Sequence, residues 1–230
     1  MQASTLFTNG AIHTMDPERP RAEALAVDAA GRIMAVGSAA ELKPLAGANT
    51  KTVDLGGRFV MPGVFDFHLH VISGMTTRLR SFAIDAGDDF AAILDHVRAA
   101  AAGKREGEWL TGSAYGARAL ADIESLGLDA KRRLNEASGG RPVLLIHGSL
   151  HGAFANEAAL SRAGIDAATP DPTGGRIVRI GGEATGLLEE NAMWIVDGAI
   201  PALGDGEIVD VAQAAVRYFN SVGVTGFVDA

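Results

Sequence analysis

The chain has 230 residues, of which 47% are hydrophobic, and it carries a formal net charge of −8. This composition excludes a disordered chain, and acids spread along the sequence argue against a nucleic-acid surface, which needs clustered Lys and Arg. The sequence contains no Cys, so disulfides, thiolate ligands and Cys nucleophiles are excluded and any metal must be held by His and carboxylates. It has neither a basic start followed by an apolar run nor an apolar stretch of membrane-spanning length, so we expect a cytoplasmic protein.

The first stretch, up to about Arg58, is typical of short strands. Residues 5–15 are β-branched and apolar but broken by the turn pair Asn9-Gly10, and the runs 24–28 and 32–36 predict a hairpin. Ser38 with Glu41 three residues later forms a capping-box pattern, which predicts a short helix to about residue 46. Strand candidates follow at 52–55 and 59–61. A small β-rich domain with one helix fits residues 1–58.

After Pro62-Gly63, residues 64–70 read VFDFHLH, which predicts a strand. Side chains two residues apart lie on one face of a strand. We therefore expect Asp66, His68 and His70 on one face, with the aromatic and leucine side chains on the other.

The rest of the chain alternates strand and helix patterns. Helices are predicted at 89–102, after the N-cap candidate Asn156, and at 187–199 and 207–222. Strands are predicted at 108–113, 142–147 and 225–228, and TPDPTGG at 169–175 indicates a loop. Such alternation after residue 61 favours βα units around a parallel sheet or barrel.

His68-Leu69-His70 is the sharpest chemical feature of the sequence. Two imidazoles two apart on a strand are able to hold one divalent ion from the same side, and zinc accepts such ligands. The carboxyl end of a strand is also where barrel enzymes build their sites, and Asp66 would orient an imidazole there. The spacing alone fits an ordinary pair of surface or core histidines equally well.

Three separated motifs resemble one protein family. GGRFVMPGVFDFHLH is similar to the signature of the amidohydrolase superfamily, in which an apolar strand after Pro-Gly ends in His-x-His. HGAFANEAALSRAGIDAATPDPTGGRIVRIGGEATGLLEENA and the closing GVTGFVDA are similar to its N-substituted formamide deformylase-like branch. The resemblance implies an α/β fold with a small β-sandwich-like domain at residues 1–58. A TIM-like (β/α) barrel would begin within 59–230, with an α/β insert at about 85–200.

The resemblance also implies site residues. His68 and His70 match metal ligands, with zinc as the expected metal, while His151 and Glu190 match candidate catalytic positions. Ser149 and Leu150 depart from the family pattern Asp-Gly-His before His151. The alternatives are a loop histidine with a structural hydrogen bond and a glutamate on a solvated helix face.

The function implied is that of a metal-dependent hydrolase acting on amide or formamide carbon–nitrogen bonds through a metal-activated water. The expected partner is a small-molecule substrate, with neither nucleic acid nor membrane. A homo-oligomer or a missing C-terminal half is the expected context, because the chain looks truncated and should be catalytically silent alone. Two alternatives stay open: a non-catalytic remnant that binds metal or a partner, and half of a split enzyme.

Overall fold

The computed structural model describes residues 2–230, which form two compact units. The first unit consists of the chain up to Leu69 together with Phe219–Ala230, and the inserted unit is His70–Tyr218. Among the described residues, no helix combines the length and apolar character needed to cross a lipid bilayer.

Two small sheets occupy the N-terminal part of the first unit. One has the order β5-β4-β1-β6 and the other the order β3-β2-β7, with only the β1–β6 and β2–β7 pairs parallel. The predicted hairpin is confirmed by the antiparallel β4–β5 pair. The strands are β1 (Thr5–Thr8), β2 (Ala11–His13), β3 (Arg21–Ala22), β4 (Ala24–Val27), β5 (Ile33–Gly37), β6 (Lys51–Asp54) and β7 (Phe59–Val60).

A single short helix follows β5 in this region. Its sequence-based capping box is confirmed, because the Ser38 side chain accepts from the Glu41 backbone N–H while the Glu41 side chain accepts from the Ser38 backbone N–H. The helix is α1 (Ala39–Leu42), and a 3₁₀ turn, η1 (Lys43–Leu45), continues it. Leu42 packs with Leu6 and Ala24 into a small core.

The first unit also contains the parallel strand pair β8 (Val64–Leu69) and β15 (Val224–Asp229). All of the inserted unit lies between these two neighbouring strands in sequence, as a parallel connection requires a long crossover. The pair leaves large apolar side chains in solvent, including Phe67, which is 77% exposed. Within the described residues the sheets do not close into a barrel, so the TIM-like barrel stays a prediction.

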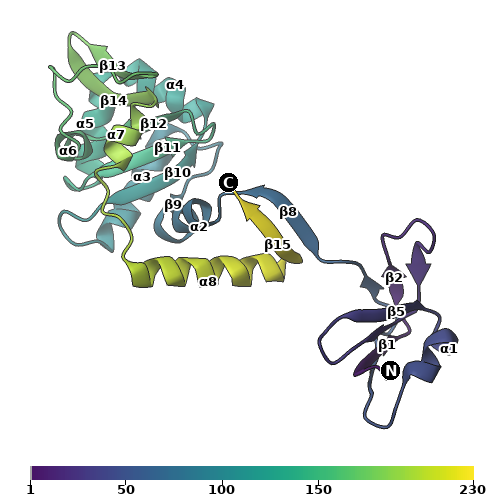
Figure 1. Cartoon of the computed structure of the whole chain (residues 1–230). Helices are drawn as coiled ribbons and strands as arrows, with labels where there is room; N and C mark the ends of the chain where they lie inside the picture. Colours follow the sequence, from purple (N-terminus) through teal and green to yellow (C-terminus); the bar gives the residue numbers. More distant parts are fainter. Residues whose placement is uncertain (1) are drawn as a thin grey trace. The chain divides into compact units, whose positions relative to one another are not determined.

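The inserted unit is built on a six-stranded mixed sheet of order β13-β14-β12-β11-β10-β9 (Figure 1). β9, β10 and β11 run parallel, whereas β12, β14 and β13 add in antiparallel fashion. The strands are β9 (Phe82–Ala83), β10 (Leu110–Tyr115), β11 (Val143–His147), β12 (Gly152–Ala155), β13 (Gly175–Ile180) and β14 (Glu183–Glu190).

Helices cover both faces of this sheet. Val143 and Leu145 of β11 pack with α3, α4 and α5, whereas Leu144, between them in sequence, packs with α6 and α7. This alternation follows from the two-residue period of a strand and makes an α/β/α sandwich. The helices are α2 (Val71–Arg80), α3 (Phe90–Ala102), α4 (Ala117–Leu126), α5 (Leu128–Ala137), α6 (Glu157–Arg162), α7 (Met193–Asp197) and α8 (Asp205–Ser221), whose last residues belong to the first unit.

The predicted helix at 187–199 is wrong. β14 continues to Glu190, and only Met193–Asp197 is helical. β14 is buried on both faces, so its apolar run shows no strand alternation and cannot be distinguished by period from a buried helix. The helices predicted at 89–102 and 207–222 and the strands at 108–113, 142–147 and 225–228 are confirmed within a few residues.

Candidate functional site

His68 and His70 lie at the carboxyl end of β8 and directly after it. His68 is an exposed strand residue, and His70 has left the strand to become the N-cap residue of α2. The Asp66 carboxylate accepts a hydrogen bond from the backbone N–H of His68 at 3.0 Å. Asp66 therefore fixes the local backbone of the motif. The placement of both imidazoles on one face, and their role as metal ligands, stay predictions.

The donor types in this segment fit a metal such as zinc, because imidazole nitrogens are among its usual ligands. The number of donors does not complete a site. Among residues 2–230, no group of three or more His, Asp or Glu side chains is arranged to hold a metal ion. Catalytic zinc sites use three protein ligands, so His68 and His70 supply at most part of one.

The two catalytic candidates, His151 and Glu190, are brought into contact although 39 residues separate them. The His151 Nδ1 atom lies 3.1 Å from a Glu190 carboxylate oxygen, and the Glu190 backbone N–H donates to the His151 carbonyl at 3.0 Å. The contact is built by the antiparallel β12–β14 ladder, in which Gly152 stands opposite Glu189. Glu190 is the last residue of β14, so the alternative of a glutamate on a helix face is wrong.

The backbone at this pair is in the left-handed region of φ, at Glu190 itself and at Leu150, which directly precedes His151. Leu150 has φ of 65° and Glu190 itself has φ of 50°. Positive φ is uncommon for residues other than glycine and recurs at functional sites. The family pattern has glycine where this chain has Leu150, so the departure noted in the sequence places a branched side chain at a position that favours glycine.

A cavity of about 320 Å³ opens beside this pair in the inserted unit. Its wall is largely apolar, and its polar lining residues include His151, His147, Ser149 and the Arg176–Glu189 ion pair. His147 is held at the end of β11 by Tyr115, whose ring packs edge-on against it at 5.0 Å between centroids. Burial raises the pKa of the Tyr115 hydroxyl, which stays protonated at neutral pH.

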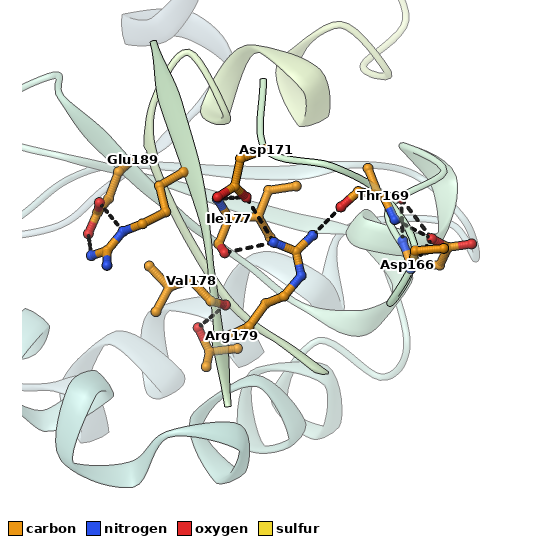
Figure 2. Close-up of polar contacts among 10 residues, drawn as sticks. Asp166, Thr169, Asp171, Ile177, Val178, Arg179 and Glu189 are labelled. Carbon is orange, nitrogen blue, oxygen red and sulfur yellow. Dashed lines mark hydrogen bonds and ion pairs between the residues drawn. The ribbon is translucent and has the colours of Figure 1, made fainter. Parts of the chain in front are cut away.

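Charged side chains around β13 are held in fixed pairs (Figure 2). Arg176 binds both carboxylate oxygens of Glu189, at 2.7 and 2.6 Å, and this contact lowers the Glu189 pKa. Arg179 donates to Asp171 at 2.8 Å, and Asp171 also accepts from the Ile177 backbone N–H, which is the main cause of its lowered pKa. These contacts fasten the TPDPTGG loop to β13.

Sequence reasoning did not single out His147, Arg176 or Glu189. His147 is the last residue of a strand that was predicted correctly, and this position at a strand end could have marked it as a candidate site residue. The Arg176–Glu189 pair depends on the β13–β14 register, in which these two residues stand opposite each other. Because the β13–β14 pairing was not predicted, the residues that face each other across it were not predicted either.

Comparison with known proteins gives consistent matches. Residues 51–230 match the family model described as the amidohydrolase family. The chain is 35% identical to Protein LONG AFTER FAR-RED 3 of Arabidopsis thaliana over 99% of its length and 38% of that protein. It is 29% identical to the N-substituted formamide deformylase of Arthrobacter pascens over 98% of its length and 42% of that protein. It thus spans about two-fifths of these curated relatives.

Solved structures agree in fold. A metal-dependent hydrolase from Pyrococcus furiosus, described as uncharacterized, superposes with a TM-score of 0.64 at 19% identity. The match covers 97% of this chain and 43% of that one. At this identity the likeness establishes the fold alone.

Proposed function

The chain belongs to the amidohydrolase family, and from this premise we propose that its activity is the metal-dependent hydrolysis of amide or formamide carbon–nitrogen bonds. The observation that carries the proposal is the family match over residues 51–230, which includes His68-Leu69-His70 at the carboxyl end of β8. The division into a β-sandwich-like domain at 1–58 and the start of a TIM-like barrel within 59–230 belongs to the same proposal. The cytoplasmic location and the small-molecule substrate remain predictions from the sequence.

His68 and His70 would hold the metal, for which we propose zinc. In such sites the ion lowers the pKa of a bound water to about 7 and polarises a carbonyl. The short side-chain contact from Asp66 to the His68 backbone keeps the end of β8 in a defined conformation.

His151 and Glu190 form the proposed proton-transfer pair. A carboxylate beside Nδ1 favours the tautomer with the proton on that nitrogen, which leaves the Nε2 lone pair able to accept a proton from the attacking water. The imidazolium that forms is then stabilised by the same carboxylate. This arrangement suits transfer of a proton to a leaving amine, and its exposed position leaves the pair open to a substrate.

The test is a hydrolysis assay with N-formyl and N-acyl amines, run on the polypeptide as its source expresses it and on residues 1–230 alone. We expect zinc-dependent release of amine from the expressed polypeptide and none from residues 1–230. His68→Ala and His70→Ala should each lower kcat/KM by about a thousandfold or more, because ligand loss removes the activated water.

The matched control is His13→Ala, which removes an imidazole from β2 that stacks on Phe59. It should leave activity unchanged. Absence of turnover in the expressed polypeptide with any divalent metal would contradict the hydrolase. Turnover by residues 1–230 alone, abolished by His68→Ala, would contradict the incomplete metal site and leave the hydrolase standing.

A further inference from the structure

The cavity beside His151 combines an apolar wall with a small number of polar groups. It lies wholly within the inserted unit, and its volume of about 320 Å³ falls in the range of small-ligand pockets, about 300–1,000 Å³. Leu120 and Ile123 of α4 and Val178 and Leu187 of the sheet supply apolar walls. A ligand that fills this space needs an apolar body, and the polar lining residues decide which head group accompanies it.

The charged side chains of the lining leave one negative charge uncompensated. Arg176 is neutralised by its two-point contact with Glu189, and a protonated His151 is compensated by Glu190. Glu124, at an exposed position of α4, lines the cavity but makes no hydrogen bond or ion pair within residues 2–230. An anionic ligand would be repelled by the Glu124 carboxylate, whereas a cationic ligand would compensate it.

The Tyr115 hydroxyl is a second polar group without a partner. Tyr115 lies on the cavity wall at the end of β10 and is only 1% exposed. Its hydroxyl makes no hydrogen bond within residues 2–230, yet it is not among the fully buried unpartnered polar atoms of that range, which are Thr76 Oγ1 and His147 Nε2. The hydroxyl therefore holds part of the small surface that Tyr115 presents to the cavity. Burial, and after it the negative charge of Glu124, raise the pKa of Tyr115, so the phenol stays protonated within the field of that carboxylate.

These groups suit an organic cation better than a metal ion. One carboxylate is far short of a ligand set for a divalent metal, and no three His, Asp or Glu side chains within residues 2–230 are arranged to hold one. A hydrated metal ion would also gain nothing from the apolar wall. A protonated amine on an apolar body matches every feature, because its N–H groups donate to a carboxylate and to a phenol oxygen while its body packs on the wall.

We propose that this cavity binds an organic ammonium cation with an apolar body. The ammonium donates to the Glu124 carboxylate and to the Tyr115 oxygen, and the body packs against Leu120 and Val178. The site is built from groups of the inserted unit alone. It requires neither a metal nor the proposed hydrolysis, so it can be tested apart from both.

The experiment titrates residues 1–230 by calorimetry at neutral pH in EDTA, so that binding is measured without metal. The probes are 2-phenylethylammonium, the neutral 2-phenylethanol and the anionic phenylacetate, which share a phenyl ring and differ in charge. We expect saturable binding of 2-phenylethylammonium, about tenfold weaker binding of 2-phenylethanol and no measurable binding of phenylacetate. The order follows because hydrogen bonds to charged groups contribute more than neutral ones.

Three variants locate the site. Glu124→Gln keeps the size of the side chain and removes its charge, so it should weaken 2-phenylethylammonium by about tenfold and leave 2-phenylethanol within about twofold. Its matched control, Glu106→Gln, removes the same charge from an exposed position outside the cavity lining and should change neither. Tyr115→Phe keeps the ring and removes the hydroxyl, and should weaken the cation by about three- to tenfold. Val178→Phe fills the cavity and should weaken both probes by about tenfold or more.

The proposal is overturned if 2-phenylethylammonium does not bind, if either comparison probe binds as tightly, or if Glu124→Gln binds the cation as the parent chain does. Should Val178→Phe fail to fold, the Glu124→Gln comparison decides alone, since an exposed helix position accepts glutamine. Binding of the cation without hydrolysis in the expressed polypeptide would remove the proposed function and keep the cation site. Hydrolysis without binding would remove the cation site and keep the proposed function.

Discussion

The inserted unit and the first unit differ in how well they bury their apolar side chains. Phe154 and Leu145 of the inserted unit are fully buried between sheet and helices. In the first unit, Phe65 and Phe67 of β8 are 50% and 77% exposed, and the four-stranded sheet packs only a small core with α1. One unit has the packing of an independent domain, whereas the other presents an apolar strand pair to solvent.

The two candidate sites therefore differ in how firmly the fold holds their side chains. The His151–Glu190 contact is set by a strand ladder inside a packed six-stranded sheet. His68 stands on a two-stranded pair, and such a pair is at best marginally stable without packing on its faces. The side-chain geometry of His68 and His70, the proposed ligands, thus depends on packing against β8, whereas the His151–Glu190 contact does not.

The largest effect is expected from a pair of phenylalanine substitutions, one in each unit, which tests this contrast. Phe154→Ala removes a fully buried ring that packs edge-on against Phe90 at 5.8 Å between centroids, and it should lower the free energy of unfolding by about 3–5 kcal/mol. Phe67→Ala should change it by less than about 0.5 kcal/mol, since the ring is exposed. Urea denaturation followed by circular dichroism measures both. Equal losses would show that β8 is packed as tightly as the inserted core.

Local signals explain what the sequence predicted well. The caps Ser38 and Asn156 were predicted because a cap depends on residues within one turn. The structure adds what spacing could not reveal for Asn156: its amide also donates to the Arg141 carbonyl at 2.8 Å and accepts from the Val143 backbone N–H at 2.9 Å. A helix cap thus also joins α6 to β11.

Long-range pairing explains what the sequence did not predict. Each half of the His151–Glu190 pair was identified by resemblance, but their contact depends on the β12–β14 register. That register was hidden because residues 187–190 of β14 were predicted as part of a helix and β12 was not predicted as a strand. His147 was overlooked for a related reason: that its Nε2 is buried without a hydrogen-bond partner among residues 2–230 is visible only after the strands are assembled.

A smaller effect is expected at residues with positive φ, of which Leu150 lies in the inserted unit and Asn9 in the first unit. Leu150→Gly relieves a strain of about 1–2 kcal/mol but adds about 0.5–1 kcal/mol of unfolded-state entropy, so we expect a net gain of about 0.5–1 kcal/mol. Asn9→Gly in the first unit should bring no gain, because asparagine tolerates φ of 55° and its amide donates to Asp54 at 2.8 Å. Thermal denaturation compares the two. A loss of stability in Leu150→Gly would mean that the leucine side chain makes a stabilising contact.

The smallest effect is the pH dependence of the Arg176–Glu189 pair. Its contact with Arg176 holds the folded-state pKa of Glu189 below the unfolded value, so the stabilisation is fully present above the unfolded pKa and is lost as pH falls through the folded one. Both side chains are about half exposed, which limits the contribution to less than about 1 kcal/mol. Glu189→Gln should therefore be slightly less stable than the parent at pH 7, and the gap should close by about pH 3.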